Sequence, residues 1–474
     1  MTGVQTCALP ISPPNLQVIP AGSLIIPMDN TYQTNGSLFN LKAYGLVNSL
    51  LHNLIPVKWA IASGKSKDGV DFSASVQRVL PTAGPTTNIS FKAGPFIVHR
   101  AFTNWATPVM SAFGNKVVVY RLMSDTPIDI RYDLTFRPRI MVLNDDGTAH
   151  IHTDLLTSAG FNSTILGAET GLPSTNFVTV PIVDTNLTAS ACYSLVSSPH
   201  FGGGGNENAK TLAIRNFIEN GGNFLAQCAA AFTYENNLNQ GLFQTTTGII
   251  DTGGPNLALS YPFPDLAFSQ FQGDMSDEGG SLQSWQAANS FVFQRATHMQ
   301  VQYTGSVKMK ASMAKLTPGS MGSAIFYLGG HEYKSANNED LNGRRMYLNA
   351  VFTPPKRLGN CAIACAQARR RLSGVNSGSS TGSAITTRSG VPKNARTQAA
   401  RTSCATGTVS RMPVGRPGMP KRRAISVASS AAPSTVRSVW QSVGSSTDSI
   451  TDMWAGQTSE RTSVPMRPRR ASMR

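Results

Sequence analysis

The stretch NFLAQCAAAFTYEN, residues 223–236, places Cys228 between a short apolar run and an alanine-rich segment. The apolar run predicts a strand and the alanine-rich segment predicts a helix, so Cys228 would lie at a strand-to-helix turn. At the start of a helix, the dipole and the backbone amides favour the thiolate, which is the nucleophilic form of cysteine. The alternative is a small apolar side chain that fills the core, as free cysteines often do.

A histidine follows another predicted strand. The run AIFYL, residues 324–328, predicts a strand that leads to His331. An imidazole at this position could act as a general base for Cys228 if the sheet brings the two strand ends together, with Glu332 or Glu235 orienting the ring. The alternative for His331 is a hydrogen bond to the backbone of a loop.

Four consecutive glycines, Gly202–Gly205, follow the strand predicted over residues 192–197 and precede a helix that Asn206 could cap. Backbone amides at such a helix start can bind an oxyanion or a carboxylate. The alternative is a flexible turn without a ligand. Cys192, which starts the preceding strand, is interpreted as a core residue.

The order of these features along the chain resembles that of the class I glutamine amidotransferase-like superfamily, which includes ThuA-like proteins. A glycine-rich loop precedes a cysteine elbow, and a late strand delivers the histidine. The resemblance covers about residues 138–355. It implies a flavodoxin-like sheet, with Cys228 matching the nucleophile, His331 the base and Gly202–Gly205 the oxyanion site.

Two other groups of polar residues could bind cations. The acidic segment GDMSDEGGS, residues 273–281, offers oxygen ligands for calcium but lacks the spacing of a known calcium loop. His150 and His152 lie near Asp145 and Asp146, but two histidines two residues apart on a helix point to different faces. We therefore predict no metal site and no cofactor.

Alternating strand and helix patterns predict an α/β fold, with two Rossmann- or flavodoxin-like units built on mainly parallel sheets. Apolar runs such as GSLIIPM, VKWAI and GPFIV are the expected strands of the first unit. In the second unit, helices are expected over residues 150–159, ending at Gly160, and over 339–352, capped by Asn338. A β-rich insertion is expected at about residues 237–315.

The positive charge lies almost entirely in the C-terminal tail. The chain has 474 residues and a net charge of +16, but residues 356–474 hold 20 of its 41 basic and 3 of its 25 acidic residues. Clustered arginine with little apolar content predicts disorder. We interpret this tail as an out-of-frame translation in preference to a phosphate-binding arm, so nucleic acid is not the expected partner. No apolar run is long enough to span a membrane.

The other end of the chain also departs from an ordinary protein sequence. The opening MTGVQTCALPI resembles a translated sequencing adapter, so residues 1–11 are interpreted as a scar and the natural N-terminus as missing. The expected organisation is therefore a first α/β unit over 12–137, an amidotransferase-like unit over 138–355 and the tail from 356.

Two functional hypotheses follow. The first is a cysteine-dependent hydrolase or amidase that uses Cys228 and His331, within an amidotransferase-like domain of a bacterial secreted or surface protein. The second is a non-catalytic module that binds a carbohydrate, another small molecule or a protein. The sparse charge of residues 1–355, and their many Asn, Thr, Ser and Gly residues, favour an extracellular or cell-surface location.

Overall fold

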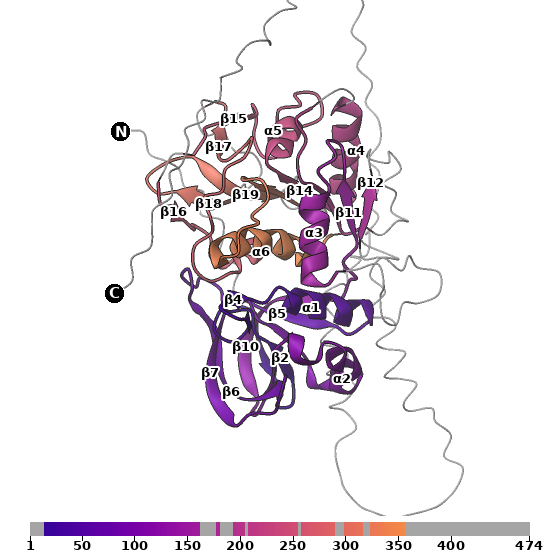
Figure 1. The fold of residues 1–474 in the computed structure, drawn as a ribbon, viewed down its shortest axis with the longest axis vertical. Helices are drawn as coiled ribbons and strands as arrows, with labels where there is room; N and C mark the ends of the chain where they lie inside the picture. Colours follow the sequence, from indigo (N-terminus) through magenta and orange to yellow (C-terminus); the bar gives the residue numbers. More distant parts are fainter. Residues whose placement is uncertain are drawn as a thin grey trace, which may run out of the picture. The chain divides into compact units, whose positions relative to one another are not determined.

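The computed structural model describes residues 14–161, 177–180, 193–203, 207–254, 257–289, 298–315 and 323–356 (Figure 1). The chain divides into two units, Met1–Thr408 and Val409–Arg474, and every described residue lies in the first. The predicted scar, Cys192, Gly204, Gly205 and the tail from residue 357 lie outside the described residues.

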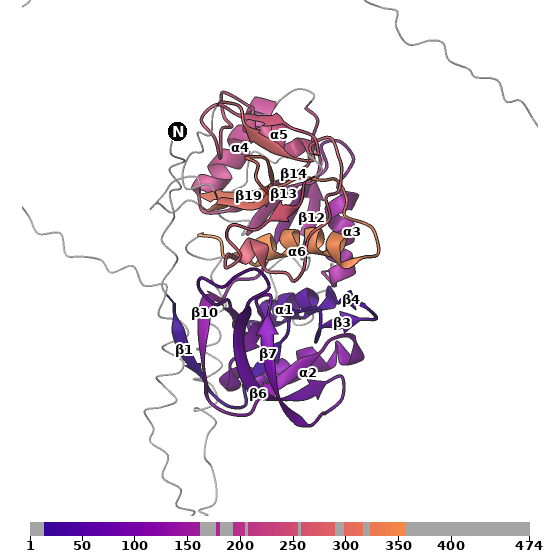
Figure 2. The same ribbon diagram turned by 90° about the vertical axis from the view of Figure 1, so that its left-hand side faces the viewer.

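The N-terminal sheet has eight strands, and all of its neighbouring strands are antiparallel. Figure 2 shows this sheet in the lower half of the view. Side chains alternate between its two faces, as the period of a strand requires. Leu24 and Ile26 face the main core, whereas Ile25 between them packs into a second apolar cluster. In spatial order the strands are β1 (Leu16–Ile19), β10 (Thr126–Leu134), β5 (Val57–Ala60), β8 (Phe96–Val98), β2 (Leu24–Ile26), β9 (Val119–Leu122), β6 (Val70–Leu80) and β7 (Thr86–Lys92).

Short elements complete this half of the molecule. Helix α1 (Lys42–His52) packs on the sheet through Leu46, Val47 and Leu50, which share one face at helical spacing. The others are the hairpin of β3 (Thr34–Asn35) and β4 (Leu38–Phe39), helix α2 (Thr103–Ser111), and the 3₁₀ turns η1 (Arg100–Phe102) and η2 (Gly114–Lys116).

The second sheet has ten strands and mixed pairing. The neighbours β12 (Phe177–Val180), β11 (Ile140–Leu143), β13 (Leu195–Ser198), β14 (Asn223–Gln227) and β20 (Ala324–Leu328) are parallel. Beyond β20, the pairing is antiparallel through β19 (Met309–Lys315), β17 (Trp285–Ala287) and β15 (Ile249–Asp251). Strand β18 (His298–Tyr303) pairs with β19 and with β16 (Leu259–Ser260), and the short η4 (Ala267–Ser269) follows β16.

Helices cover both faces of the second sheet. Helices α3 (His150–Ala159) and α6 (Asn338–Phe352) pack on one face and, together with α1, lie between the two sheets (Figure 1). Helices α4 (Glu207–Glu219) and α5 (Ala229–Glu235) cover the other face. Successive side chains of β11 point to opposite faces of the sheet. Ile140 and Val142 pack into the core that contains α3 and α6, and Met141 and Leu143 pack into the core that contains α4 and α5.

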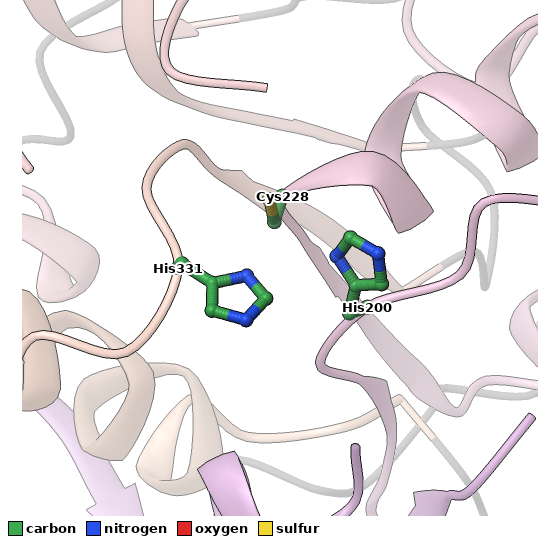
Figure 3. Close-up of side chains that lie close together, drawn as sticks. All are labelled: His200, Cys228 and His331. Carbon is green, nitrogen blue, oxygen red and sulfur yellow. The ribbon is translucent and has the colours of Figure 1, made fainter. Parts of the chain in front are cut away.

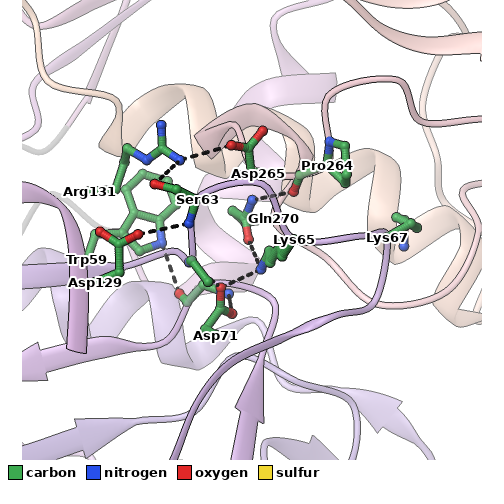
Figure 4. A network of polar contacts seen from close by, with 12 residues as sticks. Trp59, Ser63, Lys65, Lys67, Asp71, Asp129, Arg131, Pro264, Asp265 and Gln270 are labelled. Carbon is green, nitrogen blue, oxygen red and sulfur yellow. Dashed lines mark hydrogen bonds and ion pairs between the residues drawn. The ribbon is translucent and has the colours of Figure 1, made fainter. Parts of the chain in front are cut away.

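The two halves meet through close backbone packing and polar contacts. Helices α1 and α3 approach so closely that a Cβ at Gly45 would lie 2.1 Å from the Ala159 carbonyl oxygen. Lys65 Nζ lies 2.5 Å from Asp71 and 2.8 Å from Gln270 Oε1 (Figure 4). Arg131 pairs with Asp265 at 3.1 Å in the same network.

The predicted fold class is wrong. The structure is mainly antiparallel and curled, and it does not contain two Rossmann- or flavodoxin-like units with mainly parallel sheets. The error has a physical cause in the short apolar runs of the first half. Continuous apolar runs are typical of buried parallel strands, but here β2, β5 and β8 are antiparallel strands with apolar cover on both faces.

Within the described residues, no helix is both long and apolar enough to cross a membrane. This agrees with the prediction that the chain has no membrane-spanning segment.

Candidate functional site

Three side chains converge at one edge of the second sheet. His200 follows β13, Cys228 follows β14 and His331 follows β20. These three strands are parallel neighbours, so their carboxyl ends meet at the same edge, which is where open α/β sheets place ligands. The two imidazole rings point toward the space beside Cys228 (Figure 3).

Cys228 lies at a sharp turn between β14 and α5, as its sequence context predicts. Its φ and ψ are 51° and −138°, a conformation that non-glycine residues rarely adopt. The Cys228 amide donates to the Leu328 carbonyl at 2.9 Å, which ties the turn to the end of β20. The side chain is fully buried. Strained backbone of this kind costs about 1–3 kcal/mol and is concentrated at functional sites.

The sulfur atom and one nitrogen from each imidazole all lie within 4.8 Å of one another. The two rings are 5.0 Å apart between centroids and nearly perpendicular, at 78°. Burial lowers the pKa of His200, and His331 lowers it further, whereas Asp146 raises it. The arrangement can move a proton from the thiol to an imidazole or can donate three ligands to one metal ion.

The backbone of the His331 loop is held from two sides. The Glu278 carboxylate accepts hydrogen bonds from the amides of Glu332 at 3.0 Å and Tyr333 at 2.5 Å. From the other side, Gln227 donates to the His331 carbonyl at 2.6 Å. Because these contacts fix the backbone on both sides of the imidazole, they position its ring near Cys228.

A chain of buried hydrogen bonds extends behind Gln227. Its Oε1 lies 3.0 Å from His152 Nε2, and His152 Nδ1 lies 3.1 Å from the Ser197 hydroxyl. Ser197 in turn contacts the Tyr347 hydroxyl at 3.1 Å. Burial lowers the pKa of His152 to about 3, so its imidazole is neutral at pH 7. His152 therefore supports the site from within the core.

The carboxylates expected to orient His331 are placed differently. Glu332 Oε1 lies 4.0 Å from His331 Nε2, beyond hydrogen-bond distance, while Oε2 is paired with Lys334 at 2.8 Å. The hydrogen bond from Lys334 is the main cause of the lowered pKa of Glu332. Glu235 is buried elsewhere and accepts hydrogen bonds from Thr245, Tyr327 and neighbouring amides.

The glycine loop is described only in part. The Gly202 amide donates to Asp146 Oδ2 at 2.6 Å. This amide is therefore already paired with a carboxylate of the chain itself. Gly203 has a φ of 95°, which glycine adopts without strain. Since Gly204 and Gly205 lie outside the described residues, the predicted oxyanion site remains a prediction.

The residues considered for cation binding mostly serve the fold. His150 is exposed at the start of α3, whereas His152 is buried in the hydrogen-bond chain described above. In the acidic segment, Asp277 pairs with Lys310 at 3.3 Å and Glu278 holds the His331 loop. Burial lowers the pKa of Lys310, while Asp277 opposes this effect.

Sequence reasoning missed His200, Gln227 and Glu278 as members of the site. A signal for His200 was available, because it lies between a predicted strand and the glycine loop, where ligand-binding residues gather. Glu278 had no such signal. It lies 53 positions before His331 in sequence, and only the packing of the segment over β20 brings its carboxylate to the loop.

No protein-family model matches the chain, and no curated protein matches it. Solved structures give distant similarities. A cytoplasmic protein from Salmonella typhimurium has a TM-score of 0.30 at 10% identity, over 46% of this chain and 99% of that one. A GH42 β-galactosidase, Gan42B, has a TM-score of 0.24 at 11% identity, over 52% of this chain and 32% of that one.

A β-galactosidase from Bacillus circulans has a TM-score of 0.22 at 11% identity, over 53% of this chain and 34% of its own. This chain therefore spans about a third of the length of the galactosidases. Scores at this level assign neither a fold nor an activity, so the functional argument depends on the site itself.

Proposed function

We propose that the protein is a cysteine-dependent hydrolase of amide or ester bonds, with Cys228 as nucleophile and His331 as general base. The observation that carries the proposal is the strained backbone of Cys228 at the edge of the sheet, where its sulfur and one nitrogen from each of two imidazoles lie within 4.8 Å of one another. The same residues carry the resemblance to glutamine amidotransferases. Retained strain and a paired base are features of activated nucleophiles.

The chemistry follows from these positions. His331 takes the proton of Cys228, and the thiolate attacks the carbonyl carbon of the substrate. The leaving amine or alcohol departs with the proton from the imidazolium, and a thioester remains on Cys228. Water then gives a proton to the imidazole and attacks the thioester, which releases the carboxylic acid and restores the thiol. His200 lies on the other side of Cys228 from His331 (Figure 3). Its ring can stabilise the negative charge that develops on the carbonyl oxygen of the substrate.

Substrate must reach the sulfur past the imidazoles. Cys228 is fully buried, whereas the His200 and His331 side chains are 18% and 32% exposed. Gly280 also lies over the thiol, since a Cβ there would be 3.1 Å from Sγ. These features limit the size of the group that can approach the sulfur.

Alkylation of the full-length protein by iodoacetamide tests the proposal, with each cysteine read separately by peptide mass spectrometry. We expect Cys228 to react rapidly at pH 7, because the His331 imidazole can accept the thiol proton as the sulfur attacks. His331→Gln should slow the reaction by about tenfold or more. His150→Gln, a change at an exposed histidine outside the cluster, should leave it unchanged.

The full burial of Cys228 favours the second candidate function, a non-catalytic module that binds a carbohydrate or a protein. The same experiment separates the two. If Cys228 reacts only when the protein unfolds, or if His331→Gln has no effect on the rate, the hydrolase proposal is wrong and binding is the function to pursue. An extracellular or surface location is compatible with both and remains part of the proposal.

A further inference from the structure

The donor atoms of the site include one that lacks a partner. His200 Nδ1 is buried and has no hydrogen-bond partner among the described residues. Its other ring nitrogen, Nε2, lies 4.0 Å from Asp146 Oδ2. A buried nitrogen without a partner costs free energy unless a proton donor or a metal ion satisfies it. Figure 3 shows one ring nitrogen of His200 turned toward the space that Cys228 and His331 also face.

We propose that His200, Cys228 and His331 bind a divalent transition-metal ion of the zinc class, and that the bound ion blocks the Cys228 thiol. The metal site is inferred from the three donor atoms and their geometry. Only the inference that the bound ion blocks catalysis at Cys228 rests on the proposed function. Because two nitrogens and a thiolate are borderline-to-soft ligands, they select zinc-like ions over magnesium or calcium.

The distances suit this interpretation after a small movement. With bonds of about 2.3 Å to sulfur and about 2.0–2.1 Å to nitrogen, tetrahedral ligands lie about 3.3–3.6 Å apart. The three donor atoms are now within 4.8 Å of one another. The largest gap is therefore about 1.2–1.5 Å, which rotation of the two partly exposed imidazoles can close. The Cys228 turn, tied to Leu328, can remain in place.

Surrounding charges support a cation at this place. Asp146 and Glu332 each have a carboxylate oxygen 4.0 Å from Nε2 of His200 and His331, respectively. At this distance neither carboxylate forms a hydrogen bond to its ring, but both place negative charge beside a bound cation. Lys310 is a positive charge that interacts with Cys228, but its Nζ is engaged by Asp277 and by the Glu278 carbonyl.

Three protein ligands leave the fourth position of a tetrahedral ion open to water, which is the arrangement of catalytic rather than structural zinc sites. Here the ion would use the thiolate that the proposed hydrolysis needs as its nucleophile. A single thiolate cannot serve both purposes at once, so metal occupancy and acylation exclude each other.

Cobalt(II) titration of the full-length, reduced and chelator-treated protein tests the metal site. We expect one ion per chain, with a near-ultraviolet thiolate-to-cobalt charge-transfer band and visible bands of a tetrahedral ion. Cys228→Ser should abolish the thiolate band. His200→Gln and His331→Gln should each weaken binding by about tenfold or more.

Two control variants address other donors in the chain. Cys361→Ser/Cys365→Ser removes two closely spaced cysteines outside the site, and His99→Gln removes an imidazole that follows β8. Both should retain the band and the affinity. A band of unchanged intensity in Cys228→Ser, or an affinity that neither His200→Gln nor His331→Gln lowers, would overturn the inference.

A second measurement uses the wild-type protein and does not depend on the folding of a variant. Saturating Zn²⁺ should slow alkylation of Cys228 by at least tenfold, as coordination removes the free thiolate. If the metal binds but His331 does not activate the metal-free thiol, the metal site stands and the proposed hydrolase fails. If the metal-free thiol is activated but cobalt gives no thiolate band and zinc no protection, the metal site is refuted and the hydrolase stands.

Discussion

Cys228 combines an unusual backbone with a specific neighbourhood. It has a positive φ and is fully buried, and two imidazoles lie beside it. The cysteine and the two histidines follow the ends of three different strands. Ala226 and Ala230, two positions before and after Cys228, are fully buried, so the turn is closely packed on both sides of the cysteine. At this scale, small changes in volume next to the sulfur should change both the reactivity of the thiol and the stability of the fold.

Two adjacent glycines offer a matched test of that expectation. A Cβ at Gly280 would lie 3.1 Å from Cys228 Sγ and 3.3 Å from His331 Cβ, whereas a Cβ at Gly279 meets no atom within 4 Å. Gly280→Ala should slow Cys228 alkylation severalfold and lower the free energy of unfolding by about 1–3 kcal/mol. Gly279→Ala should change the free energy of unfolding by less than about 0.5 kcal/mol.

Rates of alkylation and urea unfolding curves measure both effects. Equal alkylation rates in Gly280→Ala and Gly279→Ala would show that Gly280 does not approach the thiol in solution.

The loop that follows β20 is the element on which the site depends most. It carries His331 between Gly330, with a φ of 88°, and Tyr333, with a φ of 52°. A Cβ at Gly330 would lie 2.7 Å from the Tyr333 hydroxyl, so the loop requires glycine there. The acidic segment that sequence reasoning considered for calcium instead supplies Glu278, which accepts two amides of this loop.

Glu278→Gln should therefore loosen the loop. An amide has a single acceptor oxygen, and its NH₂ group would face a backbone donor. We expect the free energy of unfolding to fall by about 1–3 kcal/mol, and the effect of His331→Gln on Cys228 alkylation to become smaller in the double variant. Glu339→Gln is the control, since Glu339 is exposed on the first turn of α6.

Urea unfolding and the alkylation rates of both single variants and the double variant give the coupling directly. Additive effects on the alkylation rate would contradict a positioning role for Glu278.

The molecule as a whole contains buried neutral histidines that connect its stability to pH. Burial lowers the pKa of His152 from 6.5 to about 3 and that of His52 from 6.5 to about 4. His52 lies 2.8 Å from the Pro138 carbonyl, and His152 lies between Ser197 and Gln227. Between these values and 6.5, the unfolded chain binds more protons than the folded protein, so stability falls as pH falls.

Each such histidine should contribute about 1.4 kcal/mol per pH unit below pH 6.5. We expect urea unfolding between pH 7 and 5 to show a loss of stability with acid that is smaller in His152→Gln by about this slope. His150→Gln, an exposed control, should follow the wild type. If the free energy of unfolding falls with pH in parallel for His152→Gln and the wild type, His152 is not buried in its neutral form in the folded protein.

Local patterns in the sequence determined several elements of this protein. The helix predicted over 150–159 is confirmed as α3, and Gly160 ends it with a φ of 93°. The predicted C-terminal helix is confirmed as α6, although its cap is Asn337, whose side chain accepts from the Asp340 amide. Cys228 follows a strand and precedes a helix, as its neighbours indicated. Such features depend on contacts within a few residues, which a sequence displays directly.

Tertiary structure alone decided the direction of strand pairing and the membership of the site. Hydrogen bonds between strands join distant segments, and an apolar run such as that of β2, although typical of parallel strands, also fits an antiparallel strand that is buried on both faces. The meeting of His200, Cys228 and His331 likewise depends on β13, β14 and β20 lying side by side, although β20 follows β14 by about a hundred residues. The sequence contains these residues, but only the order of strands in the sheet makes them neighbours.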